Sequence, residues 1–196
     1  MRVIAGQARG ARLKSPRGVH IRPMMDRVRG ALFNMIAAQG GPGERVLDLY
    51  AGTGAVGIEA LSRGAVAADF VDNHPRCCRT IQENLIAAGM KGRGRVFRRR
   101  ADRVLTRPAL LALPSGDLPT YDLVSVTPPY SHTDFVEVLH LLAKSGLVGA
   151  GATVVVEHAR TFEMPDQIDR LSRVRQRRYG ATVLTFYSLQ EELSPT

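Results

Sequence analysis

The sequence has 196 residues, of which 44% are hydrophobic and 23% are charged, as is ordinary for one globular domain with an apolar core. No stretch reaches the length of about eighteen apolar residues that a membrane-spanning helix needs. The first residues lack the apolar region of a secretory signal, so we expect a cytoplasmic protein. The adjacent Cys77 and Cys78 suit neither a disulfide nor a zinc site. We therefore expect no metal and interpret both as buried or half-buried apolar side chains.

The formal net charge of +9 is concentrated in three clusters. The first 29 residues contain eight Arg or Lys and one acidic residue, and residues 91–107 repeat that ratio. Five further arginines lie between positions 170 and 178. One interpretation is a solvated basic surface without a specific partner. The clustering and the excess of Arg over Lys favour the phosphate backbone of a nucleic acid as the partner.

The N-terminal third begins with two predicted elements. Residues 2–14 predict a basic β-hairpin around a glycine-containing turn. Residues 26–38 have apolar side chains at helical spacing and predict a helix with Asp26 as its N-cap. We expect residues 1–39, which hold this hairpin and helix, to pack on a compact domain formed by residues 40–196.

From residue 45 onward, short apolar runs that predict strands alternate with segments that predict helices. The predicted strands are 45–49, 67–71, 95–98, 121–126 and 153–157. The predicted helices are 55–63, 75–88, 102–113 with a break at Pro108, and 133–144. Residues 172–178 and 182–189 predict an antiparallel pair at the sheet edge. This order is typical of a doubly wound α/β fold, here with a mostly parallel, seven-stranded, Rossmann-like sheet and an N-terminal hairpin extension.

In such folds ligands bind at the carboxyl ends of the strands, and the first of these ends carries a glycine-rich loop, Asp48-Leu49-Tyr50-Ala51-Gly52-Thr53-Gly54. The loop continues to Gly57 and also fits the dinucleotide pattern, and Asp72 would bind ribose hydroxyls in either kind of site. A carboxylate at Asp48 would repel a pyrophosphate and attract the cationic amino-acid end of S-adenosylmethionine. Charges about 4 Å apart interact by about 4 kcal/mol near a protein surface, so Asp48 favours S-adenosylmethionine over NAD(P).

The glycine loop resembles the cofactor loop of class I methyltransferases. Upstream, Arg22-Pro23-Met24-Met25-Asp26-Arg27-Val28-Arg29 resembles the N-terminal motif of the RsmD-type 16S ribosomal RNA guanine-N2 methyltransferases. Residues 1–6, 31–34, 59–64 and 83–85 extend this resemblance over almost the whole chain. The resemblance implies transfer of a methyl group from S-adenosylmethionine to the exocyclic N2 of a guanine in small-subunit rRNA. It implies these cofactor-binding residues: Asp48, Ala51, Gly52, Gly54, Asp72, Asn73, Ala101 and Asp102. On residue type alone, Asp102 is equally well explained as the N-cap of its helix.

The fourth predicted strand ends in Thr127-Pro128-Pro129-Tyr130, which resembles the Asp/Asn-Pro-Pro-Tyr/Phe motif of methyltransferases that act on exocyclic base amines. In that motif a side-chain oxygen and the first proline carbonyl accept the two amine N–H groups, and the aromatic ring stacks on the base. We expect all four residues to be catalytic. Thr127 is a departure, because its hydroxyl has no charge, and a lost charge-assisted hydrogen bond costs about 1.5–3 kcal/mol. A rigid exposed turn is the alternative.

The resemblance also implies RNA contacts from the basic N-terminal region, and we expect them from Arg9, Arg12, Arg22, Arg27 and Arg29. Met24, Met25 and Gly30 depart from the family pattern. Three alternatives stay open: a relative that binds S-adenosylmethionine and RNA but is catalytically impaired through Thr127, an NAD(P) oxidoreductase, and a methyltransferase for an amine in DNA or protein. A monomer is expected, because one chain supplies every element of the site.

Overall fold

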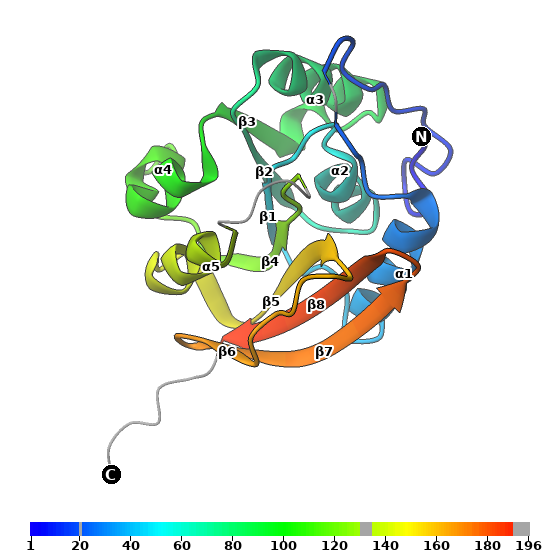
Figure 1. The fold of residues 1–196 in the computed structure, drawn as a ribbon. Helices are drawn as coiled ribbons and strands as arrows, with labels where there is room; N and C mark the ends of the chain where they lie inside the picture. Colours follow the sequence, from blue (N-terminus) through cyan, green and yellow to red (C-terminus); the bar gives the residue numbers. More distant parts are fainter. Residues whose placement is uncertain (20, 130–134, 190–196) are drawn as a thin grey trace.

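The computed structural model describes residues 1–19, 21–129 and 135–189. In this part of the chain an eight-stranded sheet runs in the order β3-β2-β1-β4-β5-β8-β7-β6 (Figure 1). β1 to β5 are parallel, and β8, β7 and β6 continue the sheet in antiparallel pairs. The strands are β1 (Arg45–Leu49), β2 (Ala67–Asp72), β3 (Gly94–Arg98), β4 (Tyr121–Val126), β5 (Val148–Ala159), β6 (Gln167–Ile168), β7 (Leu171–Tyr179) and β8 (Thr182–Leu189).

The helices follow the strands in the expected alternation. The α-helices are α1 (Asp26–Ala37), α2 (Ala55–Ser62), α3 (Pro75–Ala87), α4 (Ala101–Thr106) and α5 (Phe135–Lys144). Two 3₁₀ turns, η1 (Lys91–Arg93) and η2 (Pro108–Leu111), precede β3 and follow α4. The break that Pro108 predicts is therefore real, since a proline cannot continue the hydrogen-bonding pattern of a helix.

The predicted α/β fold with a mostly parallel sheet is confirmed. The sheet has eight strands and not the expected seven, because β6 adds two residues that pair with the start of β7. Such a short strand has no alternating pattern that sequence reasoning can detect. β5 is longer than expected and begins before Gly149 and Gly151, where its register with β4 shifts.

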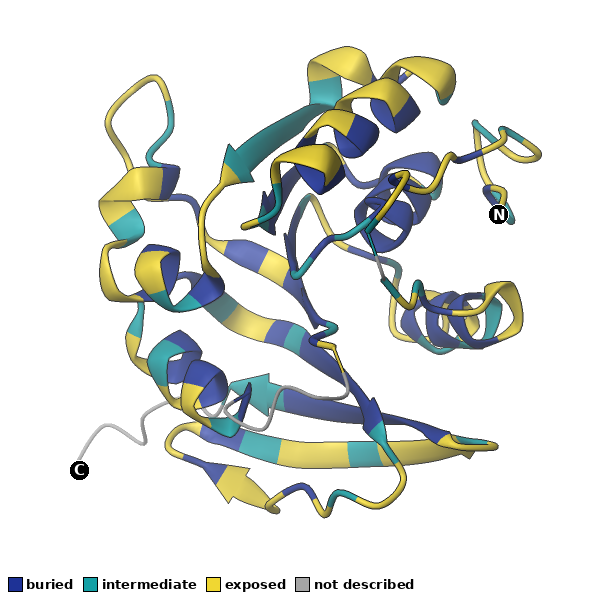
Figure 2. Ribbon diagram, turned by 45° about the horizontal axis from the view of Figure 1, so that its top comes forward, coloured by how far each residue is buried: buried dark blue, intermediate teal, exposed yellow. Residues whose placement is uncertain are grey.

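Alternating side chains of the strands fill two apolar layers, one on each face of the sheet. On one face Val46, Phe70, Leu123 and Val155 pack with α1, α2 and α3. On the other face the neighbouring strand positions pack against α4 and α5. Figure 2 shows α1, α3, α4 and α5 exposed on their outer sides, whereas α2 is buried throughout and β7 is largely exposed. No helix in the described ranges is long and apolar enough to cross a bilayer.

The predicted N-terminal hairpin is only partly formed. Arg2 and Arg12 make a single antiparallel bridge, and the amide N–H of Val3 donates to the Ala11 carbonyl at 3.0 Å, but no regular strand results. The turn is held instead by α2: the Gln7 N–H donates to the Ser62 carbonyl at 2.8 Å. Backbone groups that satisfy the end of a helix are unavailable for strand pairing. Val3 and other apolar residues of this segment belong to the same core as β1 and β2.

The start of α1 also differs from the expectation. Met25 occupies the N-cap position and makes no side-chain capping bond, so the prediction of Asp26 as N-cap is wrong. Asp26 is the first helical residue, and its carboxylate accepts a hydrogen bond from Arg29 at 3.1 Å, one turn further along.

Candidate active site

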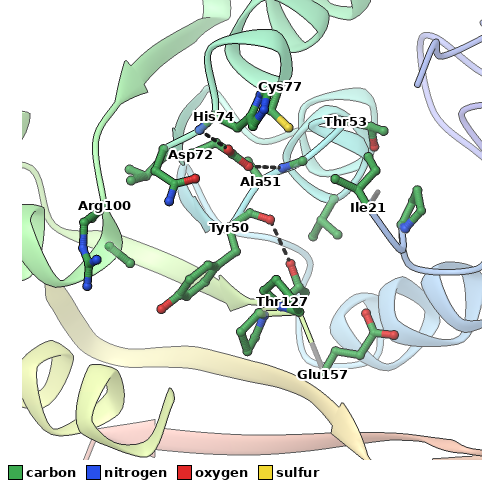
Figure 3. A pocket seen from close by; sticks show the side chains of 18 of the residues that line it. Ile21, Tyr50, Ala51, Thr53, Asp72, His74, Cys77, Arg100, Thr127 and Glu157 are labelled. Atoms are coloured by element: carbon green, nitrogen blue, oxygen red, sulfur yellow. Dashed lines mark hydrogen bonds between the residues drawn. The ribbon is translucent and has the colours of Figure 1, made fainter. Parts of the chain in front are cut away.

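A cavity of about 680 Å³ opens at the carboxyl edge of the parallel strands (Figure 3). This volume lies in the range of pockets that hold a small molecule or cofactor. Four of its walls are formed by the segments that follow parallel strands: the β1–α2 loop, the β2–α3 turn, the β3–α4 turn and the residues after β4. The segment before α1 and one side of α5 complete it. The edge that the sequence predicts for ligand binding is therefore where the cavity lies.

The glycine loop between β1 and α2 turns because its residues adopt left-handed backbone angles. Gly52 and Gly54 have φ values of 56° and 75°, and Tyr50 has a φ of 59°, which is strained for a residue with a side chain. Gly57 serves close packing instead, since a Cβ there would lie 2.3 Å from the ring of the buried Phe70. The loop thus combines a tight turn with a helix pressed against β2.

Asp48 and Gly54 belong to the strand and loop behind the cavity wall, and neither residue lines the cavity. The Asp48 carboxylate is buried and accepts the N–H of Gly57 at 3.0 Å. Burial raises the pKa of Asp48 to about 7, although the Gly57 N–H opposes this rise. The charge on Asp48 is therefore not a fixed property near neutral pH, which weakens the attraction to a cationic ligand that the sequence argument used.

Asp72, at the end of β2, joins two walls of the cavity. One carboxylate oxygen accepts the N–H of Gly52 and the other accepts the N–H of His74, both at 2.8 Å. These bonds hold the carboxylate in the wall while leaving further lone pairs for a ligand hydroxyl. Ala51, Gly52 and the exposed Asn73 lie on the same side of the cavity.

Ala101 and Asp102 form the β3 side of the cavity. Ala101 is buried, and Asp102 pairs with the exposed Arg100, whose Nε lies 3.0 Å from a carboxylate oxygen. This pairing holds the pKa of Asp102 below its ordinary value. Residue 100, and not Asp102, occupies the N-cap position of α4. The alternative interpretation of Asp102 as an N-cap is therefore wrong.

Thr127 and Pro128 close the cavity from the end of β4, opposite the glycine loop. The Thr127 hydroxyl donates a long hydrogen bond of 3.5 Å to the Tyr50 carbonyl, and the Thr127 N–H reaches the Leu49 carbonyl at 3.4 Å. Pro129 also lines the cavity and is exposed. Tyr130, the fourth predicted catalytic residue, lies outside the described residues.

Four of the five arginines expected to contact RNA are exposed: Arg9, Arg12, Arg22 and Arg27. Arg22 also lines the cavity. Arg29 has no exposed surface, and its guanidinium donates to the Arg2 carbonyl and lies 3.7 Å from the buried Glu59 carboxylate. A fully buried side chain cannot contact a phosphate on the surface, so the expectation for Arg29 is wrong.

The basic cluster at residues 91–107 divides in the same way. Arg95 donates to both carboxylate oxygens of Asp69, with distances of 2.7 and 2.6 Å, and to two main-chain carbonyls. Arg93 bonds to main-chain carbonyls around the end of α2 and to Gln7. These two arginines stabilise the fold, whereas Arg99 and Arg100 are exposed beside the cavity.

Sequence reasoning missed several residues that line the cavity. Val19, Ile21 and Met24 cover it from the segment before α1, and Glu157 enters it from the end of β5. The position of Glu157 after the buried run Val154–Val156 was the available signal, because it is another polar residue at a parallel strand end. Within the described residues, no group of three or more His, Cys, Asp or Glu side chains has the arrangement of a metal site.

The sheet order, the glycine loop on β1 and the carboxylate at the end of β2 define the class I methyltransferase fold. Comparison with known proteins gives the particular family. The family described as "Conserved hypothetical protein 95" matches residues 1–188, and the chain belongs to this family, which is the RsmD type that the sequence motifs indicate.

Individual relatives agree with this assignment over nearly their whole length. The chain is 34% identical to YlbH of Bacillus subtilis over 190 residues, which are 95% of this chain and 98% of the relative. It is 29% identical over 192 residues to the Escherichia coli protein named "Ribosomal RNA small subunit methyltransferase D", covering 98% and 91% of the two chains. The solved structure of yhhF from Escherichia coli superposes with a TM-score of 0.80 at 29% identity and covers 98% of this chain and 99% of that one.

Proposed function

We propose that this protein transfers a methyl group from S-adenosylmethionine to the exocyclic N2 of a guanine in small-subunit rRNA. One observation carries the proposal. The Thr127 hydroxyl and the Tyr50 carbonyl are hydrogen-bonded at 3.5 Å, so the loop after β4 meets the glycine loop at one cavity wall. An acceptor for an amine therefore lies beside the loop that would hold the methyl donor.

The residues present fit S-adenosylmethionine. Asp72 would accept the ribose hydroxyls, because its carboxylate is held in the cavity wall by two backbone N–H groups. Buried Ala101 and Val71 offer an apolar surface for the adenine, with Asp102 and Asn73 at its edge. Ala51 and Gly52 allow the backbone to approach the amino-acid end closely. When bound, S-adenosylmethionine supplies a methyl group activated on a sulfonium.

The loop after β4 would hold the substrate amine. The Thr127 hydroxyl hydrogen points to the Tyr50 carbonyl, which leaves the hydroxyl lone pairs to accept an N–H. The carbonyl of Pro128 would accept the second N–H, as the resemblance to the Asp/Asn-Pro-Pro-Tyr/Phe motif implies, and Tyr130 would stack on the base. Orientation of the nitrogen toward the methyl carbon is the main contribution of such a site.

The exposed Arg9, Arg12, Arg22 and Arg27 support a nucleic-acid substrate, since each contact with a phosphate releases counterions. The relatives named for small-subunit ribosomal RNA indicate which nucleic acid to test. The alternative is a protein that binds S-adenosylmethionine and rRNA with little turnover. Thr127 favours it, because a neutral hydroxyl stabilises a developing positive charge less than a carboxylate does.

The test is transfer of labelled methyl from S-adenosylmethionine to small ribosomal subunits that lack guanine-N2 methylation. The labelled RNA is digested and its modified nucleoside is identified by mass spectrometry. We expect N2-methylguanosine at one position. Label in another nucleoside would contradict the N2 assignment. Tight binding of S-adenosylmethionine and rRNA without label would favour the alternative of a binding protein.

A further inference from the structure

Glu157 is a buried carboxylate that lines the cavity and does not belong to the four-residue motif after β4. The side chain is 7% exposed and lines the cavity from the end of β5. Glutamate is rarely this buried without a specific role, because removing its charge from water is costly. The position therefore calls for a function.

The sheet register puts Glu157 beside Thr127. β4 and β5 are parallel, and Val126, the last residue of β4, pairs with Val156, so Thr127 and Glu157 directly follow this last pair. Paired positions project to the same face, and neighbouring strands lie about 4.8 Å apart. Both residues continue the face that carries Leu123 and Val155. Figure 3 shows the two side chains leaving adjacent strand ends at the same part of the cavity.

Two other carboxylates of the cavity wall, Asp72 and Asp102, lie at the ends of β2 and β3, which are not neighbours of β4 in the sheet. Asp72 accepts two backbone N–H groups on the side of the glycine loop, and Asp102 pairs with Arg100 at the β3 side. Glu157 is the carboxylate whose strand position adjoins the uncharged Thr127. The family motif has a polar oxygen, often a carboxylate, at position 127, so the chain carries a negative group one strand away from where the motif has it.

A carboxylate beside the substrate nitrogen would assist methylation of an amine. The nitrogen lone pair forms the bond to the methyl carbon, and the electron pair of the carbon–sulfur bond stays with sulfur. The positive charge therefore moves from sulfur to nitrogen, and the nitrogen must then lose one proton to become a neutral methylamine. A carboxylate next to the nitrogen stabilises the transferred charge and accepts that proton.

We propose that Glu157 is a catalytic residue that supplies the negative charge that an aspartate at position 127 would provide. Its carboxylate contacts the substrate amine and stabilises the positive charge on the nitrogen. It then accepts the proton that the nitrogen loses and releases this proton to solvent. This inference rests on the proposed function. It explains how a chain with threonine at position 127 retains a competent site, and it assigns Thr127 the smaller role of accepting one N–H.

The experiment compares wild type with Glu157→Gln, Thr127→Asp and the double variant in the methyl-transfer assay. Glu157→Gln keeps the size of the side chain and should lower kcat 10- to 100-fold. Thr127→Asp alone should not raise kcat, because two carboxylates would then lie on paired strand positions. In the double variant the aspartate restores the single charge, so kcat should exceed that of Glu157→Gln at least fivefold. Glu163→Gln, an exposed residue in the loop after β5, is the matched control and should leave kcat unchanged.

Thermal unfolding shows that each variant is folded at the assay temperature, and equilibrium binding of S-adenosylmethionine to Glu157→Gln should match wild type within experimental error. A Glu157→Gln protein with kcat within twofold of wild type would overturn the assignment. So would a loss that Thr127→Asp does not rescue, because a structural role predicts no rescue. Wild type without transfer to any RNA would instead refute the proposed function, and the role of Glu157 with it.

Discussion

The guanidinium of Arg29 and the carboxylate of Glu59 lie side by side in the interior, with 3.7 Å between Nε and Oε2 and no exposed surface on either side chain. Glu59 also accepts the N–H groups of Ile4 and Ala5, at 2.8 and 3.1 Å. Arg29 in turn donates to the Arg2 carbonyl. The pair thus joins α1, α2 and the first residues of the chain.

Arg29→Ala should lower the free energy of unfolding by roughly 1–3 kcal/mol, because it removes a fully buried side chain and its hydrogen bond to the Arg2 carbonyl, whereas Glu59 keeps its ion pair with Arg63 at 2.7 Å. Arg27→Ala, on the exposed side of the same helix, should change it by less than about 0.5 kcal/mol. Urea unfolding of both variants measures the contrast. Equal small effects would mean that the buried pair contributes little to stability.

The same two residues distinguish a structural arginine from an RNA contact. If Arg27 binds a phosphate, Arg27→Ala should weaken RNA binding and reduce the slope of log K against log salt by about one unit. Folded Arg29→Ala protein should keep the wild-type slope. The measurement is a binding titration at several salt concentrations, and a reduced slope for Arg29→Ala would contradict its structural assignment.

Two helical glycines should respond to alanine with opposite signs. At Gly57 a Cβ would meet the Phe70 ring at 2.3 Å, so Gly57→Ala should destabilise by about 1–3 kcal/mol and weaken cofactor binding by shifting the glycine loop. At Gly30 a Cβ would make only an ordinary contact of 3.7 Å with Ile4, so Gly30→Ala should stabilise by about 0.5–1 kcal/mol through helix propensity. Chemical unfolding tests both, and a stabilised Gly57→Ala protein would contradict the close packing of α2 on β2.

Asp48 should make stability depend on pH. Burial raises its pKa in the folded protein to about 7, whereas the unfolded chain loses this proton near pH 4. Between these values the unfolded state binds fewer protons, so the contribution of Asp48 to the free energy of unfolding falls as pH rises, by at most about 1.4 kcal/mol per pH unit. Asp48→Asn removes this dependence. Its stability relative to wild type should therefore increase from pH 5 to pH 7 and level off above, as urea unfolding at each pH will show. A constant difference would mean that Asp48 is ionised throughout.

The two cysteines should react slowly in the folded protein. Burial, aided by the nearby Asp72 charge, raises the pKa of Cys77 to about 12, and burial also raises that of Cys78. At pH 8 only about one Cys77 side chain in ten thousand would be a thiolate, the reactive form. Alkylation by iodoacetamide, followed by mass spectrometry, should be at least 100-fold slower for the native than for the urea-unfolded protein. Rapid native labelling of Cys77 would show that the cavity opens to expose it.

The sequence by itself determined the order and type of the sheet's elements apart from the short β6, and also the glycine loop and the family. These are local properties: apolar periodicity gives strand and helix, and a parallel sheet places every strand end, including Asp72 and Thr127, at one edge. The burial of Cys77 and Cys78 also follows from their apolar character and helical position.

Only the tertiary structure decided which charged residues face a ligand. Arg29 and Arg27 are two positions apart in one basic motif, yet one is buried against Glu59 and the other is exposed. Asp48 lies beneath the glycine loop and not in the cavity, and Glu157 enters the site because the register of β5 places it next to Thr127. Arg29 and Glu59 are 30 residues apart in sequence, as are Thr127 and Glu157, and Asp48 contacts Gly57 across the turn of the glycine loop. The sequence shows that a side chain is charged. Only the packing of the folded chain determines whether that side chain contacts solvent, a counter-ion or a substrate.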